Sequence, residues 1–175
     1  MLKRNIQYHR YTNYVYPKDK IVALLNQALD LTPSKQSTIP YRILVLGPNQ
    51  TKTKDFLYKA TIAPINDKEA CDHNHQVEAP WVLLFYKRKN DSNHSMNPET
   101  MLIEIGMFSS ILTQLCIKED LNVSYTKCFL SKNDKIWEDA PVKPPLFALS
   151  IGRGQPNQVC SREIRPEKKN IFLFK

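Results

Sequence analysis

The sequence predicts a single α+β domain over residues 1–175, in which a central antiparallel or mixed sheet is flanked by helices. Two segments carry apolar residues at the three- and four-residue spacing of amphipathic helices. Short apolar runs bounded by Gly or Pro indicate strands, and their spacing lacks the regular alternation of a doubly wound parallel sheet. With 175 residues, the chain can enclose one hydrophobic core and is too short for two ordinary domains.

The first helix is expected over residues 18–31, because its apolar residues recur at helical intervals and Pro33 stops the pattern. A short helix is expected within residues 52–63. A long helix begins near Asn97-Pro98 and should form the centre of the molecule. Its broad apolar face consists of Met101, Leu102, Ile105, Phe108, Ile111, Leu112 and Leu115. One small core would not cover so much apolar surface, which predicts a partner.

Four runs predict strands. Residues 42–47 are apolar and close with Gly47-Pro48, and residues 81–86 follow Ala79-Pro80. Residues 145–152 and 171–174 complete the set. Because an exposed apolar strand is an aggregation hazard unless it pairs, the last of them is expected to pair with a partner.

Charge and targeting signals narrow the function classes. The chain has 25 Lys and Arg against 17 Asp and Glu, a net charge of +8, which would attract phosphates, nucleic acid or acidic membranes alike. The cations are spread along the chain, which is more typical of a solvated surface than of a nucleic-acid groove. No apolar run has membrane-spanning length and the N-terminus lacks a secretory signal, so we expect a cytoplasmic protein without a membrane partner. Neither a Rossmann nor a P-loop fingerprint is present, which argues against both enzyme classes.

The cysteines do not suggest a metal or redox site. Cys71, Cys116, Cys128 and Cys160 are far apart, with no C-x-x-C pair, so reduced thiols are expected. The run from Cys71 to His75 holds metal-ligating residue types, but its spacing matches no tetrahedral site that we can name. A polar loop is the simpler interpretation, and no metal is assigned.

Three polar clusters could bind an anion or a polar ring. Arg10 and the Thr12 hydroxyl could grip a phosphate, although an arginine near a chain end is more often a solvated charge. Arg162 and Arg165 present the same alternatives. The third cluster follows Pro33, where free backbone donors and small hydroxyls could reach a ring edge or could instead bond their own turn. It consists of Ser34, Lys35 and Ser37.

Taken together, three segments resemble the nitroreductase family of FMN flavoproteins. These are residues 10–16, residues 32–41, and Ile151-Gly152 followed by Arg162 and Arg165-Pro166. The family has R-x-S near the start, P-S-x-x-N-x-Q-P-W after the first helix, and a late basic residue near a proline. Ala79-Pro80 and Glu104-Ile105-Gly106 support the likeness, which covers most of the chain.

The resemblance implies an FMN-dependent oxidoreductase that transfers hydride from NAD(P)H through bound flavin to a nitroaromatic, quinone or flavin. It implies a homodimer with flavins at the interface, where the loop after the first helix comes from the partner. It also implies that the strand at residues 171–174 exchanges with the partner subunit. The implied cofactor-binding residues are Arg10, Thr12, Pro33, Ser34, Lys35, Ser37, Gly152, Arg162 and Arg165. Which of the last two contacts the phosphate stays open, and no catalytic residue is assigned.

The sequence departs from the family motifs at four positions. Ser37, Ile39 and Tyr41 stand where the family has Asn, Gln and Trp, and Tyr14 stands in place of a second basic residue. The departures at Ser37, Ile39 and Tyr14 favour an alternative, in which the chain is a catalytically weak flavin-binding or interaction protein on the same fold.

Overall fold

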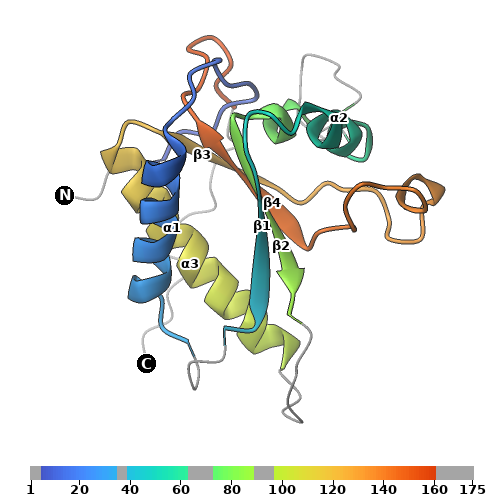
Figure 1. Cartoon of the computed structure of the whole chain (residues 1–175), viewed down its shortest axis with the longest axis horizontal. Coiled ribbons are helices and arrows are strands. Elements are labelled where there is room, and N and C mark those ends of the chain that lie inside the picture. Colours follow the sequence, from blue (N-terminus) through green and yellow to red (C-terminus); the bar gives the residue numbers. More distant parts are fainter. Residues whose placement is uncertain (1–4, 35–38, 63–72, 89–96, 161–175) are drawn as a thin grey trace, which may run out of the picture.

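The protein was studied as a computed structural model, which describes residues 5–34, 39–62, 73–88 and 97–160. Its centre is a four-stranded antiparallel sheet with the strand order β1-β2-β4-β3. Two helices, α1 and α3, cover one face of the sheet, and α2 lies on the other face (Figure 1). The predicted α+β class is therefore confirmed, and the sheet is antiparallel among the described strands.

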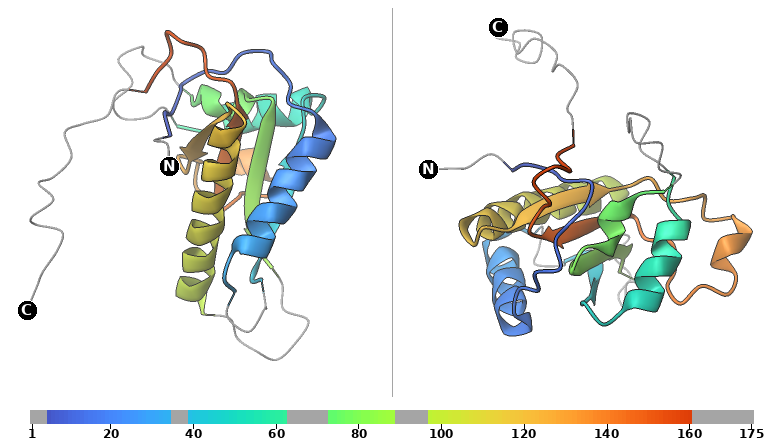
Figure 2. Two further views of the ribbon diagram at one scale, coloured as in Figure 1. Left: turned by 90° about the vertical axis from the view of Figure 1, so that its left-hand side faces the viewer. Right: turned by 90° about the horizontal axis from the view of Figure 1, so that it is seen from above.

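The helices form where the apolar spacing predicts them. Helix α1 is Lys18–Leu31, and α3 is Pro98–Lys118, with the Asn97 side chain accepting a hydrogen bond from the Glu99 amide at its start. Helix α2 is Thr51–Lys59, which is shorter than the expected window. Figure 2 shows α1 and α3 side by side on their face of the sheet. The structure also contains two short 3-10 helices that were not predicted, η2 at His75–Glu78 and η3 at Lys135–Trp137.

The strands are β1 Tyr41–Leu46, β2 Trp81–Lys87, β3 Asn122–Thr126 and β4 Phe147–Gly152. Three of them match the predicted runs to within two residues. Strand β3 is a strand that sequence reasoning missed. The predicted strand at residues 171–174 lies outside the described residues, so its exchange with a partner stays a prediction.

The central strand β2 is buried on both faces and divides the interior into two cores. Trp81, Leu83 and Phe85 point toward α1 and α3, whereas Val82 and Leu84 point toward α2. The first core also contains Ile21, Ala28, Tyr41, Ile105, Phe108, Leu112 and Phe147. The second contains Tyr11, Leu46, Leu57, Val77, Trp137 and Ala148.

Helix α3 is central, as predicted, but its apolar face is only partly used. Ile105, Phe108 and Leu112 are buried against the sheet, while Leu102 and Ile103 are 54% and 62% exposed. By length and composition α3 is the one described helix that could cross a membrane. Because its buried side packs in the first core, we interpret it as the core helix of a globular domain.

Candidate functional site

The segment before α1 lies alongside the segment after β4, at the upper end of the sheet in Figure 1. The Thr12 amide donates to the Arg153 carbonyl at 2.8 Å, and the Gln155 amide donates to the Arg10 carbonyl at 3.1 Å. Tyr11 and Gly154 form an antiparallel bridge between them. Residues from two distant parts of the sequence, Arg10 and Thr12 on one side and Gly152 on the other, are thus neighbours, although sequence alone only suggested each separately.

Tyr11 anchors this junction. Its hydroxyl donates to Ser124 Oγ at 2.6 Å and lies 3.1 Å from the Ser150 carbonyl oxygen. Burial raises the pKa of Tyr11 well above its ordinary value, so the phenol keeps its proton as the donor. Gly152 permits the close approach, because a Cβ there would lie 2.9 Å from the Tyr11 ring.

Arg10 is held by a histidine and a carboxylate on η2. Arg10 Nη2 lies 2.9 Å from His75 Nε2, and His75 Nδ1 lies 2.5 Å from Glu78 Oε2. The carboxylate can only accept, so Nδ1 carries the imidazole proton and Nε2 accepts from Arg10. A guanidinium has five N–H donors, and this contact uses one. Arg10 is exposed, so its other donors can reach a ligand.

Arg153 brings a second cation to the same junction, and sequence reasoning missed it. Its guanidinium carbon lies 3.8 Å from the centre of the Tyr14 ring, a cation–π contact. Tyr14 is the position at which the family motif has its second basic residue. The Tyr14 ring therefore contacts a cation, the Arg153 guanidinium, that comes from the segment after β4. The available signal was the place of Arg153 in the sequence, directly after Gly152.

Pro33 and Ser34 lie at the opposite end of α1 from this junction. Ser34 Oγ donates to Glu104 Oε2 at 2.9 Å and accepts from the Ile39 amide at 3.1 Å. Its only proton is thus committed within the chain. Helix α1 has 14 residues, which corresponds to about 20 Å, so one chain does not bring this loop to Arg10. Lys35, Ser37, Arg162 and Arg165, the other predicted site residues, lie outside the described residues.

A polar pocket of about 360 Å³ borders the junction on the side of α2. It is lined by Thr12 and Asn13, by the α2 residues Lys54 and Asp55, and by Glu78. Lys54 is 5% exposed and donates to the carbonyl oxygens of Ala79 and Pro80 at 2.6 and 2.9 Å. Burial lowers the pKa of Lys54 from 10.5 to about 8. The burial of Lys54 was not predicted from the sequence, because a lysine in a short polar helix is ordinarily exposed.

The histidines of the Cys71–His75 run make local hydrogen bonds. His73 Nδ1 lies 2.8 Å from the Thr61 carbonyl oxygen, and His75 pairs with Glu78. Among the described residues, His, Cys, Asp and Glu side chains do not gather in groups of three that could hold a metal. Cys71 lies outside those residues.

No protein-family model matches the chain, and no curated protein matches its sequence. Solved structures do match. A candidate nitroreductase from Desulfovibrio desulfuricans, in complex with FMN, has a TM-score of 0.71 and 18% identity, covering 98% of this chain and 92% of that one. A candidate nitroreductase from Exiguobacterium sibiricum, also with FMN, gives 0.70 and 17%, covering 99% and 93%.

A third solved structure has the same architecture and is described as a different kind of flavin enzyme. A candidate NAD(P)H:FMN oxidoreductase from Staphylococcus epidermidis has a TM-score of 0.69 and 15% identity, covering 98% of this chain and 92% of that one. At such identities the comparison establishes architecture rather than activity. The expectation drawn from the sequence motifs is confirmed at that level: the chain has the nitroreductase-like fold.

Proposed function

We propose that the protein is an FMN-dependent oxidoreductase that works as a homodimer. The observation that carries the proposal is the junction of Arg10, Thr12 and Gly152 at one end of a fold whose solved examples include FMN complexes. These are residues that the sequence motifs single out. The shared fold extends over nearly the whole chain, which supports the proposal.

The donor set at the junction suits a phosphate monoester. Thr12 Oγ1 accepts from the Tyr14 amide at 3.4 Å, which leaves the hydroxyl proton free to point outward. Arg10 keeps free N–H donors beyond its contact with His75, and Arg153 stands on the Tyr14 ring. Two guanidinium groups and a hydroxyl provide charge-assisted hydrogen bonds for a dianion, so the residues present fit the phosphate of FMN.

The ring end of the flavin would need a second copy of the chain. The Pro33–Ser34 loop lies a full helix length from the junction, so it would reach a flavin held by a partner's junction, not by its own. Leu102 and Ile103, exposed on α3, supply apolar surface for such a dimer. In this arrangement Ser34 holds the loop through Glu104, and Lys35 and Ser37 are proposed to meet the ring.

Bound FMN would supply the redox chemistry, taking hydride from NAD(P)H and delivering it to an acceptor such as a nitroaromatic, a quinone or a flavin. The chain's contribution is binding and orientation. Arg10 is oriented by His75 and Glu78, and the antiparallel junction holds Thr12 beside β4. No side chain of the described part is assigned as acid, base or nucleophile, which flavin chemistry does not demand.

The experiment is a flavin titration of the purified protein and of three variants. Arg10→Ala should weaken FMN binding about ten- to hundredfold, because a charge-assisted hydrogen bond contributes about 1.5–3 kcal/mol. Arg153→Ala should weaken it about tenfold. Lys135→Ala, in the η3 turn, is the matched loss of an exposed cation away from the junction and should leave binding unchanged. Wild-type protein that ignores FMN would overturn the proposal.

One observation favours a catalytically weak flavin-binding protein as the second candidate. The Ser34 hydroxyl, expected to face the ring, donates instead to Glu104. The two candidates differ in turnover. Rapid anaerobic bleaching of bound flavin by NADH or NADPH supports the oxidoreductase, whereas bound flavin that stays oxidised supports the second candidate. Light scattering that reports a monomer at micromolar concentration would contradict the dimer in both.

A further inference from the structure

A second and larger concavity lies at the lower end of the sheet, away from the junction. It has a volume of about 790 Å³ and opens between the edge strand β1 and residues 141–146. We call it the β1 groove. Its lining is Arg42, Ile43, Leu44, Tyr86, Lys87, Lys132, Pro141, Val142, Lys143, Pro144 and Leu146. This volume is within the range of small-molecule sites.

The groove is a built feature, because two hydrogen bonds fasten its outer wall to β2. The Tyr86 hydroxyl donates to the Lys143 carbonyl at 3.0 Å, and the Leu146 amide donates to the Phe85 carbonyl at 2.8 Å. Among the described residues, Tyr86 packs at the margin of the second core, whereas Leu44 belongs to neither core. The floor is therefore apolar sheet surface that remains accessible, with Leu44 41% exposed.

The rim of the groove is cationic. Arg42, Lys87, Lys132 and Lys143 all belong to the lining, and its described residues include no Asp or Glu. Within the described part of the chain, none of these four cations forms an ion pair. The pocket beside Thr12 differs, because Asp55 and Glu78 both line it. Long basic side chains add their aliphatic stems to an apolar wall and keep their charges at the edge, so one surface can hold both parts of an amphiphile.

We propose that the β1 groove binds an amphiphilic anion, of the class of medium-chain fatty carboxylates. The apolar chain would lie on Leu44, Tyr86 and Val142, and the carboxylate would meet the basic rim. This assignment is independent of flavin binding, since the described residues that line the groove and those of the junction are different. An apolar floor whose described residues carry four cations and no carboxylate is complementary to a molecule that is apolar along its length and negative at one end.

Other occupants fit the charge and shape less well. The chain's own C-terminal residues 171–174 are apolar, but residues 162–169 ahead of them carry four basic and two acidic residues, the same sign as the rim. Nucleic acid would need aromatic stacking surfaces along a basic track, and Tyr86 is the one aromatic residue among the lining residues that the structure describes. A bilayer surface would contact a protruding patch more readily than a recessed floor behind residues 141–146.

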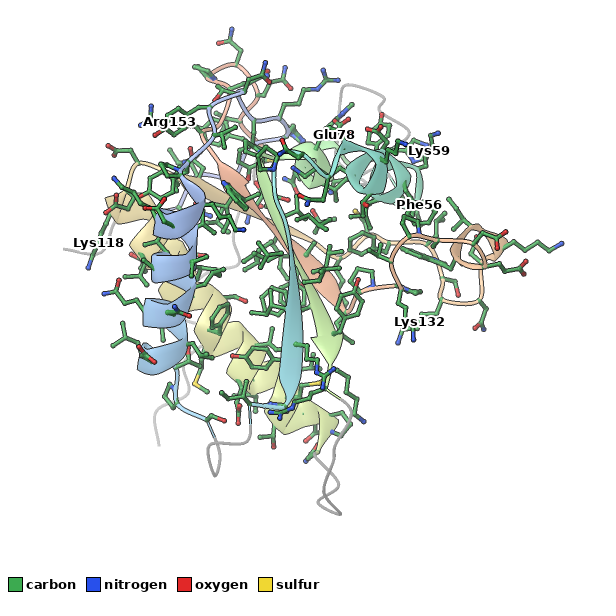
Figure 3. The ribbon with its side chains drawn as sticks, in the orientation of Figure 1. Phe56, Lys59, Glu78, Lys118, Lys132 and Arg153 are labelled. Carbon is green, nitrogen blue, oxygen red and sulfur yellow. The ribbon has the colours of Figure 1, made fainter. Side chains whose placement is uncertain are left out.

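The test is calorimetric titration of the full chain with monomeric dodecanoate, with dodecanol as the uncharged probe. We expect a dodecanoate Kd on the order of 10–100 μM, and dodecanol weaker by about tenfold. Arg42→Gln combined with Lys143→Gln should weaken dodecanoate about tenfold and leave dodecanol unchanged. Leu44→Gln, an exposed position, should weaken both. Lys118→Gln is the control, and Figure 3 shows Lys118 on the opposite side of the molecule from Lys132.

Three outcomes would overturn the proposal. Equal affinity for dodecanoate and dodecanol would show an apolar surface without anion recognition. Unchanged dodecanoate affinity in the double variant would place the binding elsewhere. Dodecanoate binding that appears only after residues 170–175 are removed would identify the tail as the occupant. Circular dichroism of each variant verifies that the fold is kept.

Discussion

The two faces of the sheet are covered in different ways. On the α1 and α3 side, aromatic rings pack directly on one another: Phe85 and Phe147 stack with centroids 4.4 Å apart, and Phe108 meets Phe85 edge-on at 6.0 Å. Tyr41 lies 5.9 Å from Phe108. Two long helices seal this face, and its buried interior consists almost entirely of apolar side chains.

The α2 side mixes apolar packing with buried polar groups. Gln76 donates to the Tyr8 carbonyl at 2.9 Å and accepts from Thr126 Oγ1 at 3.1 Å. The Asn74 amide donates to Thr61 Oγ1 at 2.8 Å. Lys54 is buried on the same side. Each polar group here needs a specific partner, so this face depends on hydrogen bonding where the other depends on packing.

The α1 and α3 face serves mainly to stabilise the fold, whereas the α2 face carries the candidate binding sites. The pocket beside Thr12 and the β1 groove both open on the α2 side, and Arg10 is held there by η2. A closed aromatic face can keep the sheet rigid while the opposite face keeps polar groups and accessible surface. We therefore expect substitutions on the first face to affect stability most, and substitutions on the second to affect binding and pH response.

The largest effect should come from Phe108→Ala. Phe108 is 1% exposed between the sheet and α3, so its loss leaves a cavity that costs about 3–5 kcal/mol of unfolding free energy. Phe56→Ala is the matched change on the α2 face, where the ring is partly buried against Trp137. It should cost about half as much. Urea unfolding measures both, and equal losses would show that the two faces are equally well packed.

A pH effect of about 2 kcal/mol should come from Lys54. Its pKa is about 8 in the folded chain and about 10.5 when unfolded, so between these values the unfolded state binds the extra proton. Stability contributed by Lys54 therefore rises with pH, by about 2 kcal/mol from pH 7.5 to 9.5. Subtracting the profile of Lys54→Met cancels other groups. A difference that stays flat over this range would mean that the two carbonyls hold the proton as firmly as water does.

The contrast also explains what sequence could predict. Residues 18–31 have apolar residues at helical spacing, and β1, β2 and β4 are short apolar runs. These patterns predict one helix and three strands, and all four elements are confirmed. Strand β3 lacks that signal because its buried positions include Ser124 and Thr126, while Tyr125 is 49% exposed. Its hydroxyls are satisfied by partners far away in the sequence, such as Tyr11 and Gln76.

Some residues of the candidate site could be predicted from the sequence, and others could not. Arg10, Thr12 and Gly152 could be singled out from motifs, because a family pattern specifies residue types in order. Arg153 and His75 could not, since their roles arise from contacts with Tyr14 and Arg10 that only folding creates. The Ser34–Glu104 bond is of the same kind, joining residues 70 positions apart.

Apart from its near-neutral control, Tyr14→Phe, the smallest stability effect should come from Tyr11→Phe, which tests the polar anchoring of the junction. The change keeps the buried ring and removes the hydroxyl that donates to Ser124 Oγ, so about 1–2 kcal/mol should be lost. Tyr14→Phe removes a hydroxyl from an exposed ring and keeps the face on which Arg153 rests, so it should change stability by less than about 0.5 kcal/mol.

Because Tyr11 holds the segment that carries Arg10 and Thr12, its variant should also bind FMN several-fold more weakly, and Tyr14→Phe should not. Urea unfolding and flavin titration measure the two effects separately. If Tyr11→Phe lost stability but bound FMN as tightly as the parent, the anchoring would be structural only, and the phosphate end of the site would lie away from this junction.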